Sequence, residues 1–249
     1  MRSNIVGLLV LCLACLTVTV GPAMAQAPAA PHKIWDVAVS VGIAATSGNS
    51  ETSQFNVTYD LTYDPLTRNI FKSNGLFLRG TTDGDLSAER VLFNVRDEYK
   101  INDRTYVFGN NLYLRDRFKS ISYLDAVTGG IGYKLVATDR TKLDVDGGAG
   151  GVWEKNTALT RTSSGAVTAG EKLQHQLTST TTLTESVTAL WKTKDFEDAL
   201  YTFGAGVAVA VSSRTQLKFE VLDVYKNKPP TPDVKKHDVA TVVAIVFKA

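Results

Sequence analysis

The sequence is poor in cysteine, and its cysteines lie where they cannot serve a folded domain. Cys12 and Cys15 are the two that it has, and both fall within the first 25 residues. Once those residues are removed, as argued below, the chain has no thiol for a disulfide, a zinc site or a nucleophile. Cysteine chemistry is therefore excluded for the mature protein.

Blocks of like charge and long apolar runs are also missing beyond the N-terminal stretch. Removal of residues 1–25 takes away Arg2 and no acidic residue, which leaves 26 basic and 25 acidic residues. A nucleic-acid partner would require a clustered basic face, so the even balance argues against one. No later apolar run is long enough for a membrane helix. No glycine-rich phosphate loop leads from a strand into a helix, so nucleotide binding has no basis.

The first 25 residues have the three parts of a secretory signal. Arg2 provides a positive start, residues 5–20 are nearly all apolar, and residues 23–25 (Ala-Met-Ala) form a small-x-small cleavage site. The apolar stretch has 16 residues, fewer than the roughly 20 that a helical span needs. The sequence thus predicts export, a signal peptide over 1–25 cleaved near Ala25, and a flexible leader over 26–33.

What the rest of the chain has in abundance is alternation with a period of two. In residues 55–63 every odd position is Phe, Val, Tyr or Leu, and the positions between them are mostly polar. A helix would spread these apolar residues around its axis, whereas a strand places them on one face. The pattern therefore favours amphipathic strands.

Twelve such segments can be found, and most are ten to thirteen residues long. They are 34–46, 53–64, 69–80, 89–100, 105–115, 124–136, 142–154, 167–177, 183–191, 199–211, 215–225 and 237–247. Strands of this length, tilted by about 40°, cross a hydrocarbon layer of roughly 25 Å. Soluble sandwiches typically have strands of about 5 or 6 residues. The sequence predicts an all-β, up-and-down antiparallel transmembrane β-barrel of about twelve strands over 34–249.

The connections alternate in length, which gives an independent indication. Residues 65–68, 101–104 and 137–141 are short, whereas 81–88, 155–166 and 226–236 are longer. Outer-membrane barrels pair short periplasmic turns with longer external loops. The alternation predicts a periplasmic N-terminus and a cell outer membrane of a Gram-negative bacterium as the location.

Three segments fit the pattern less well. Residues 69–80 are mixed on both faces, Asn110 lies on the presumed lipid face of 105–115, and Glu171 and His175 share a face with leucines in 167–177. Ten or fourteen strands therefore stay open at this point.

The polar faces of the segments carry charges of both signs, as expected for a wet lumen, although an exposed sheet face would accept them too. The residues expected to face inward are Asp60, Arg90, Arg96, Glu98, Arg115, Asp125, Lys142, Asp144, Asp146, Lys172, Lys218 and Glu220. Candidate lumen or anion-contact residues are Arg90, Arg96, Glu98, Arg115, Arg117, Asp144 and Asp146. Charges of both signs could pair across the lumen and plug much of it, so a plugged lumen and a narrow polar pore for a small polar solute both stay open at this point.

Several short motifs resemble a bacterial family labelled salt-induced outer-membrane proteins, a domain of unknown function, over residues 37–247. The motifs are Thr46-Ser47-Gly48-Asn49-Ser50, Ala88-Glu89-Arg90, Arg115-Asp116-Arg117-Phe118, Gly130-Ile131-Gly132-Tyr133, Thr138-Asp139-Arg140-Thr141 and Lys235-Lys236-His237-Asp238. The resemblance implies an outer-membrane barrel of unestablished biochemical role. The partners expected are outer-membrane lipid and, during insertion, the barrel-assembly machinery.

A catalytic site has little support in the residues. His175, with Ser179 four residues later and Glu171 on its own face, has the residue types of a serine hydrolase. A surface histidine is the better interpretation, so the chain is expected not to be an enzyme and to need no metal or cofactor. An envelope protein is the leading hypothesis. An outer-membrane hydrolase acting on lipid or peptide and a soluble periplasmic ligand-binding protein are the alternatives.

Overall fold

The computed structural model describes the chain except for residues 1–32, 48–51, 83–84, 158 and 249. The regular structure of the described part is β, in twelve strands. The strands are β1 (Trp35–Ser47), β2 (Thr52–Tyr63), β3 (Asn69–Thr82), β4 (Asp85–Lys100), β5 (Thr105–Asp116), β6 (Ile121–Ala137), β7 (Thr141–Asn156), β8 (Thr162–Gln176), β9 (Thr181–Lys192), β10 (Asp195–Ala210), β11 (Thr215–Lys226) and β12 (His237–Lys248).

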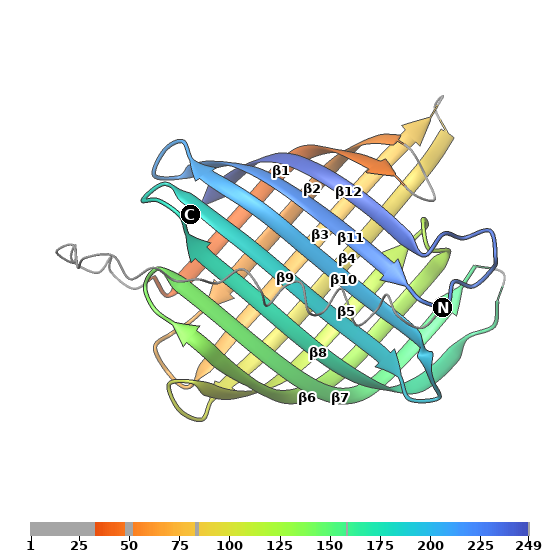
Figure 1. Ribbon diagram of the computed structural model, residues 1–249, viewed down its shortest axis with the longest axis horizontal. Helices are drawn as coiled ribbons and strands as arrows, with labels where there is room; N and C mark the ends of the chain where they lie inside the picture. The colour runs from red at the N-terminus through yellow and green to blue at the C-terminus, as the bar shows by residue number, and fades with distance from the viewer. Residues whose placement is uncertain (1–32, 48–51, 83–84, 158, 249) are drawn as a thin grey trace, which may run out of the picture. The chain divides into compact units, whose positions relative to one another are not determined.

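The strands form one closed antiparallel barrel, in which each strand pairs with its neighbours in sequence and β1 pairs with β12. Figure 1 shows the strands running obliquely around the barrel, from β1 in red to β12 in blue. Closure removes free sheet edges, so that strands can satisfy each other's backbone N–H and C=O groups. The predicted all-β, up-and-down barrel of twelve strands is confirmed, and the three weaker segments are all strands of it.

The strands extend further at one end of the barrel than the alternation predicts. β4 begins at Asp85 and β8 at Thr162, whereas the sequence pattern begins at 89 and 167. The added residues are mainly small or hydroxylated. They still pair with the neighbouring strand, as Thr162 of β8 does with Glu154 of β7. Since backbone pairing does not need apolar side chains, hydropathy alone misses these extensions.

The two ends of the barrel differ in their connections. Because the number of strands is even, β1 begins and β12 ends at the same end, here called the inner end. The inner end has the short turns 64–68, 101–104, 138–140, 177–180 and 211–214. The opposite, outer end is mixed: the connections 117–120 and 193–194 are just as short, whereas 227–236 has ten residues. The long loops predicted at 81–88 and 155–166 are wrong, because most of those residues extend the strands. The β3–β4 hairpin also projects at the outer end in Figure 1. Short turns are typical of the periplasmic side, so the inner end is assigned to the periplasm.

Most inner turns share one local device. The side-chain oxygens of Asn102, Thr138, Thr178 and Ser212 accept hydrogen bonds from backbone N–H groups two or three residues later. Such side chains close a tight turn without help from the rest of the fold. The need to close a tight turn therefore explains why an Asn, Thr or Ser recurs at the start of these turns.

The outer surface of the barrel is an apolar band between two aromatic layers. Exposed apolar side chains include Val41, Ile131 and Ile245 in the strands. The Trp35 and Tyr63 rings meet at the inner end with centroids 4.3 Å apart, and Trp191 donates from Nε1 to the Tyr201 hydroxyl at the outer end (3.0 Å). An outward apolar band on a closed barrel is expected for contact with lipid. A soluble periplasmic β-protein is therefore not favoured.

The predicted signal peptide over 1–25 and nearly all of the leader over 26–33 lie outside the described residues. Both stay predictions. Within the described ranges, no helix is long and apolar enough to cross a membrane.

Candidate functional site in the barrel lumen

Most of the charged residues predicted to face the lumen do so. Inward-pointing positions alternate along each strand, and on β4 they are the even-numbered ones, with Arg90 and Glu98 buried. Arg96 and Asp146 contact each other from β4 and β7, which lie three strands apart around the barrel. The even-numbered positions of β4 and β7 therefore point inward, and they include Arg90, Arg96, Glu98, Asp144 and Asp146.

The predicted faces of β5 and of part of β6 are wrong. On β5 the inward residues are Tyr106, Phe108 and Leu114, which are buried, so Asn110 faces the lumen and Arg115 faces outward. Asp125 also lies on the outer face, beside Tyr113. The apolar face of β5 was assigned to lipid, but it fills the lumen instead. Arg117 is an exposed residue of the β5–β6 connection.

The inner half of the lumen has a layer of ion pairs centred on Arg96. Its guanidinium donates from Nε to Glu98 (2.9 Å) and from Nη2 to Asp146 (2.9 Å). Lys72 on β3 reaches the second oxygen of Glu98 at 2.7 Å. These contacts join β3, β4 and β7, so they confirm that charges of opposite sign pair across strands.

Aromatic rings and glycines support this layer. The Arg96 guanidinium lies 3.7 Å from the centroid of the Phe108 ring, a cation–π arrangement. A side chain at Gly132 would meet the Tyr106 ring at 2.1 Å. Glycine is therefore required on β6 so that the inward ring of β5 can lie flat against the barrel wall.

On the side of β2, β7 and β8, the inner half of the lumen is open to water. Asp60, Lys142, Lys172 and Gln174 point inward and are exposed, although they lie on the inside of a closed barrel. Asp144 and Lys172 are direct cross-strand partners on β7 and β8. This half is a polar vestibule that opens toward the inner end.

The outer half of the lumen has the opposite character. It is packed with apolar side chains contributed by strands from β3 around to β12, and nearly all are less than a tenth exposed. The buried members are Leu78, Leu114, Phe118, Ile121, Leu124, Ala126, Val152, Ala166, Leu190, Leu200, Val224, Val242 and Ala244. We call these residues the apolar seal.

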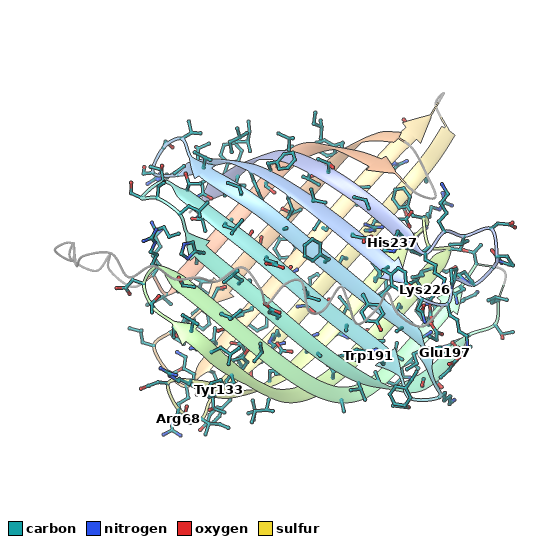
Figure 2. The ribbon with its side chains drawn as sticks, in the orientation of Figure 1. Arg68, Tyr133, Trp191, Glu197, Lys226 and His237 are labelled. Carbon is teal, nitrogen blue, oxygen red and sulfur yellow. The ribbon has the colours of Figure 1, made fainter. Side chains whose placement is uncertain are left out.

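A quartet of charges, buried except for the partly exposed Asp198, covers the seal on the side of β7–β11. Lys226 donates to Glu154 (2.9 Å) and to Asp198 (3.3 Å), and Lys192 bonds to the same two carboxylates. The quartet has two charges of each sign, so its burial leaves no net charge in the lumen. Figure 2 shows Lys226 with Trp191, Glu197 and His237 at the outer end, opposite Arg68 and Tyr133.

The β5–β6 connection, residues 117–120, folds inward and covers the other side. Asp116 binds Nε of Arg90 at 2.7 Å and also accepts from the backbone N–H of Phe118. Lys119 is fully buried, and its Nζ donates to the carbonyl oxygens of Lys235 (3.1 Å) and Lys236 (2.6 Å).

Lys119 also pairs with the Asp238 carboxylate at 3.0 Å. Burial lowers the pKa of the Lys119 ammonium from its usual value, and the nearby carboxylate opposes that shift. The connection is thus fastened to the start of β12 by three polar contacts. Three of the motifs that carry the family resemblance, those at 88–90, 115–118 and 235–238, meet at this point.

The seal has one polar side. Asn56, Leu78 and Arg90 are cross-strand neighbours on β2, β3 and β4 and all point inward. In the described part of the chain, both polar atoms of the Asn56 amide and Nη2 of Arg90 are buried without a hydrogen-bond partner. Each such group costs about 1–3 kcal/mol, so this side of the seal favours contact with water or a polar solute.

The hydrolase candidate is not assembled. His175 lies on the outer face of β8, and its Nδ1 contacts the Thr141 hydroxyl at 2.8 Å rather than Ser179. Among the described residues, no group of three or more His, Cys, Asp or Glu side chains could hold a metal ion.

Sequence reasoning missed the two outer charge clusters. Glu154, Lys192 and Lys226 occupy the outer ends of their strands, where apolar alternation stops, and Lys119 lies in a predicted loop. A buried charge looks like an exposed one in a hydropathy pattern. The motifs at 88–90, 115–118 and 235–238 were the sequence features that marked the position of Lys119.

Comparison with known proteins agrees with this description. Residues 39–248 match the family described as "Protein of unknown function, DUF481". The "Uncharacterized protein YdiY" of Escherichia coli (strain K12) is 21% identical over 220 residues, which cover 88% of this chain and 85% of that protein. Neither description assigns a biochemical role.

Solved structures share the fold. The NanC porin aligns with a TM-score of 0.58 at 10% identity, over 85% of this chain and all of that one. The COG4313 outer membrane channel from Pseudomonas putida F1 aligns with a TM-score of 0.53 at 11% identity, over 91% of this chain and all of that one. Together with the lipid-facing band, these likenesses identify an outer-membrane barrel, located in the outer membrane.

Proposed function

We propose a channel function for this chain, which belongs to the family "Protein of unknown function, DUF481". The barrel is a narrow channel for small polar solutes that is closed at its outer end in the state described above. Its gate is the apolar seal together with the connection 117–120. The vestibule of the inner half receives the solute from the periplasmic side or releases it there.

The observation that carries the proposal is the polar side of the seal. A permanently filled lumen would gain stability from an apolar residue in place of Asn56, whose amide is fully buried and unpartnered. Displacement of the connection 117–120 would expose that amide and Nη2 of Arg90 to water. The row Asn56–Leu78–Arg90 is therefore the best candidate for the conducting path.

The charges of the vestibule favour passage of small solutes without a strong preference for one sign of charge. Lys72 and Arg96 are balanced there by Glu98 and Asp146. Mixed charges weaken the net field along the path, whereas a lumen of one sign would select strongly for the opposite ion. A link to salt or other stress, which the label 'salt-induced' of the resembled family implies, stays a prediction.

Planar-bilayer recording of the purified, folded barrel tests the channel. Phe118→Ala removes the ring that packs on Leu78 and Val242 in the seal, at a cost to the closed state of about 3–5 kcal/mol. We expect its open probability to exceed that of the wild type by at least about tenfold, since a tenfold change needs only about 1.4 kcal/mol. Asn56→Leu should act in the opposite direction and lower the current.

Phe93→Ala is the matched control, because it makes the same change on the lipid-facing surface. It should leave the current steps as they are in the wild type. A Phe118→Ala barrel that is folded and carries no current would contradict a channel. That result would favour a second candidate function, a sealed structural protein of the envelope. The paired charges of Glu154, Lys192 and Lys226 in the lumen also fit this second function.

A further inference from the structure

The outer end of the barrel carries a group of arginines on its lipid-facing surface. Arg79 on β3, Arg115 on β5 and Arg117 in the β5–β6 connection are all exposed. Arg79 pairs with Glu89 of β4, and the N–H of Arg117 donates to the Glu89 carbonyl at 2.9 Å. Arg115 lies one row closer to the membrane, where it pairs with Val91. The three residues thus occupy neighbouring positions on adjacent backbone segments.

The charge of this group is not balanced. Arg115 contacts the Glu89 carboxylate at 3.2 Å, and that carboxylate is mostly buried. In the part of the chain that the structure describes, Arg79 and Arg117 have no ion-pair partner. Among the carboxylates whose side chains the structure describes, the next on this face is Asp125, which accepts a hydrogen bond from Asn111 (2.7 Å). With Glu89 counted, the group has an excess of two positive charges.

The level of the group in the membrane follows from its aromatic neighbours. Phe77, Phe93 and Tyr113 are exposed on the same outer face. Arg79 lies two residues beyond Phe77 on β3, and Arg115 lies two residues beyond Tyr113 on β5. Exposed aromatic side chains of a barrel mark the interface between hydrocarbon and headgroups. The arginines therefore lie at the headgroups of the outer leaflet.

We propose that Arg79, Arg115 and Arg117 bind the phosphate groups of a phosphorylated glycolipid in the outer leaflet. Each guanidinium presents a planar fork of N–H donors that suits phosphate oxygens, and Arg remains charged at any physiological pH. The acyl chains of the same lipid would lie over Phe77, Phe93 and Tyr113.

The outer rim at β9–β12 differs from the rim at β3–β5. On the same rim, β9–β12 carry the carboxylates of Asp195, Glu197 and Asp223 on or near the outer surface. Lys228 is engaged there by Asp195 and Glu197. That side offers no comparable excess of positive charge, so a lipid phosphate is expected to favour β3–β5.

Native mass spectrometry of the folded full-length barrel in detergent tests the site. The probe is bisphosphorylated lipid A, a multiply acylated glucosamine disaccharide, with fully dephosphorylated lipid A beside it. The triple variant Arg79→Gln, Arg115→Gln, Arg117→Gln should bind the phosphorylated probe at least about tenfold more weakly, because several charge-assisted contacts are lost together. Binding of the dephosphorylated probe should not change.

The matched control is Arg68→Gln, Arg104→Gln, Arg214→Gln, which removes three exposed arginines from turns at the inner end. It should bind like the wild type. Equal weakening in both triples, or no weakening in the first, would overturn the proposal. Displacement of lipid A by millimolar inorganic phosphate would overturn the lipid assignment. If the first triple does not fold, Arg79→Gln with Arg117→Gln leaves the Arg115–Glu89 pair intact and provides the same comparison.

Discussion

The outer and inner halves of the lumen are walled by the same twelve strands, yet they differ in almost every physical respect. The outer half is packed with buried apolar side chains and covered by buried ion pairs. The inner half has exposed charges such as Lys142 and Lys172 on its wall. The number of strands therefore does not decide whether a barrel of this size is open, because side-chain filling differs from one level to the next.

The two halves should also respond differently to the loss of a charge. In the outer half, water cannot compensate for a missing partner, so a buried charge that loses its counterion is costly. In the open vestibule of the inner half, water reaches side chains such as Lys142 and Lys172 and can replace a lost contact. Mutations at matched positions in the two halves can therefore test this difference.

The largest effect is expected for Glu154→Gln. Glu154 is fully buried and is shared by Lys192 and Lys226, so the change leaves an excess cation in a dry part of the lumen. The free energy of unfolding should fall by about 3–5 kcal/mol. Urea-induced unfolding of the micelle-bound barrel, followed by tryptophan fluorescence, measures this.

The control for that change is Glu220→Gln. Glu220 pairs with Lys218 at 2.8 Å in a partly exposed position of the lumen. Its loss should cost less than about 1 kcal/mol. Similar costs at Glu154 and Glu220 would contradict a dry outer half.

A somewhat smaller effect is expected for Leu124→Ala. Leu124 is fully buried in the apolar seal. Its truncation should destabilise the barrel by about 2–5 kcal/mol, depending on how far the surrounding side chains close the cavity. Gln174→Ala in the open vestibule should change stability by less than about 0.5 kcal/mol. A mild effect of Leu124→Ala in the same unfolding assay would mean that water already fills the outer half.

The contrast between the two halves explains where sequence reasoning succeeded. Alternation predicts a strand whether its apolar face meets lipid or a packed lumen, so all twelve strands were found. The inward charges of the open vestibule, such as Lys142 and Lys172, were also placed correctly. There, polar side chains point to water and apolar ones to lipid, which is the assumption behind the pattern.

The same assumption fails wherever apolar side chains fill the lumen. On β5 the face with Phe108 and Leu114 is apolar because it fills the lumen, and the opposite face carries Arg115 toward the headgroups. Hydropathy has no means of separating two kinds of apolar surroundings, so Arg115 and Asn110 were placed on the wrong faces.

The contacts that hold the connection 117–120 over the seal could not be predicted from local sequence patterns. Lys119 is 116 residues away from Lys235 in the sequence, and their contact exists only because the barrel closes. Contacts of this range follow from the three-dimensional register of the strands rather than from any short segment.

Thiol labelling tests the difference between the halves most directly, because the chain beyond Cys15 has no cysteine of its own. Lys172→Cys in the vestibule and Val152→Cys in the seal would be reacted separately with a charged, water-soluble methanethiosulfonate. We predict that the thiol at 152 reacts at least about 100-fold more slowly than the thiol at 172, since local opening must come first. Equal labelling rates at the two positions would contradict a sealed outer half.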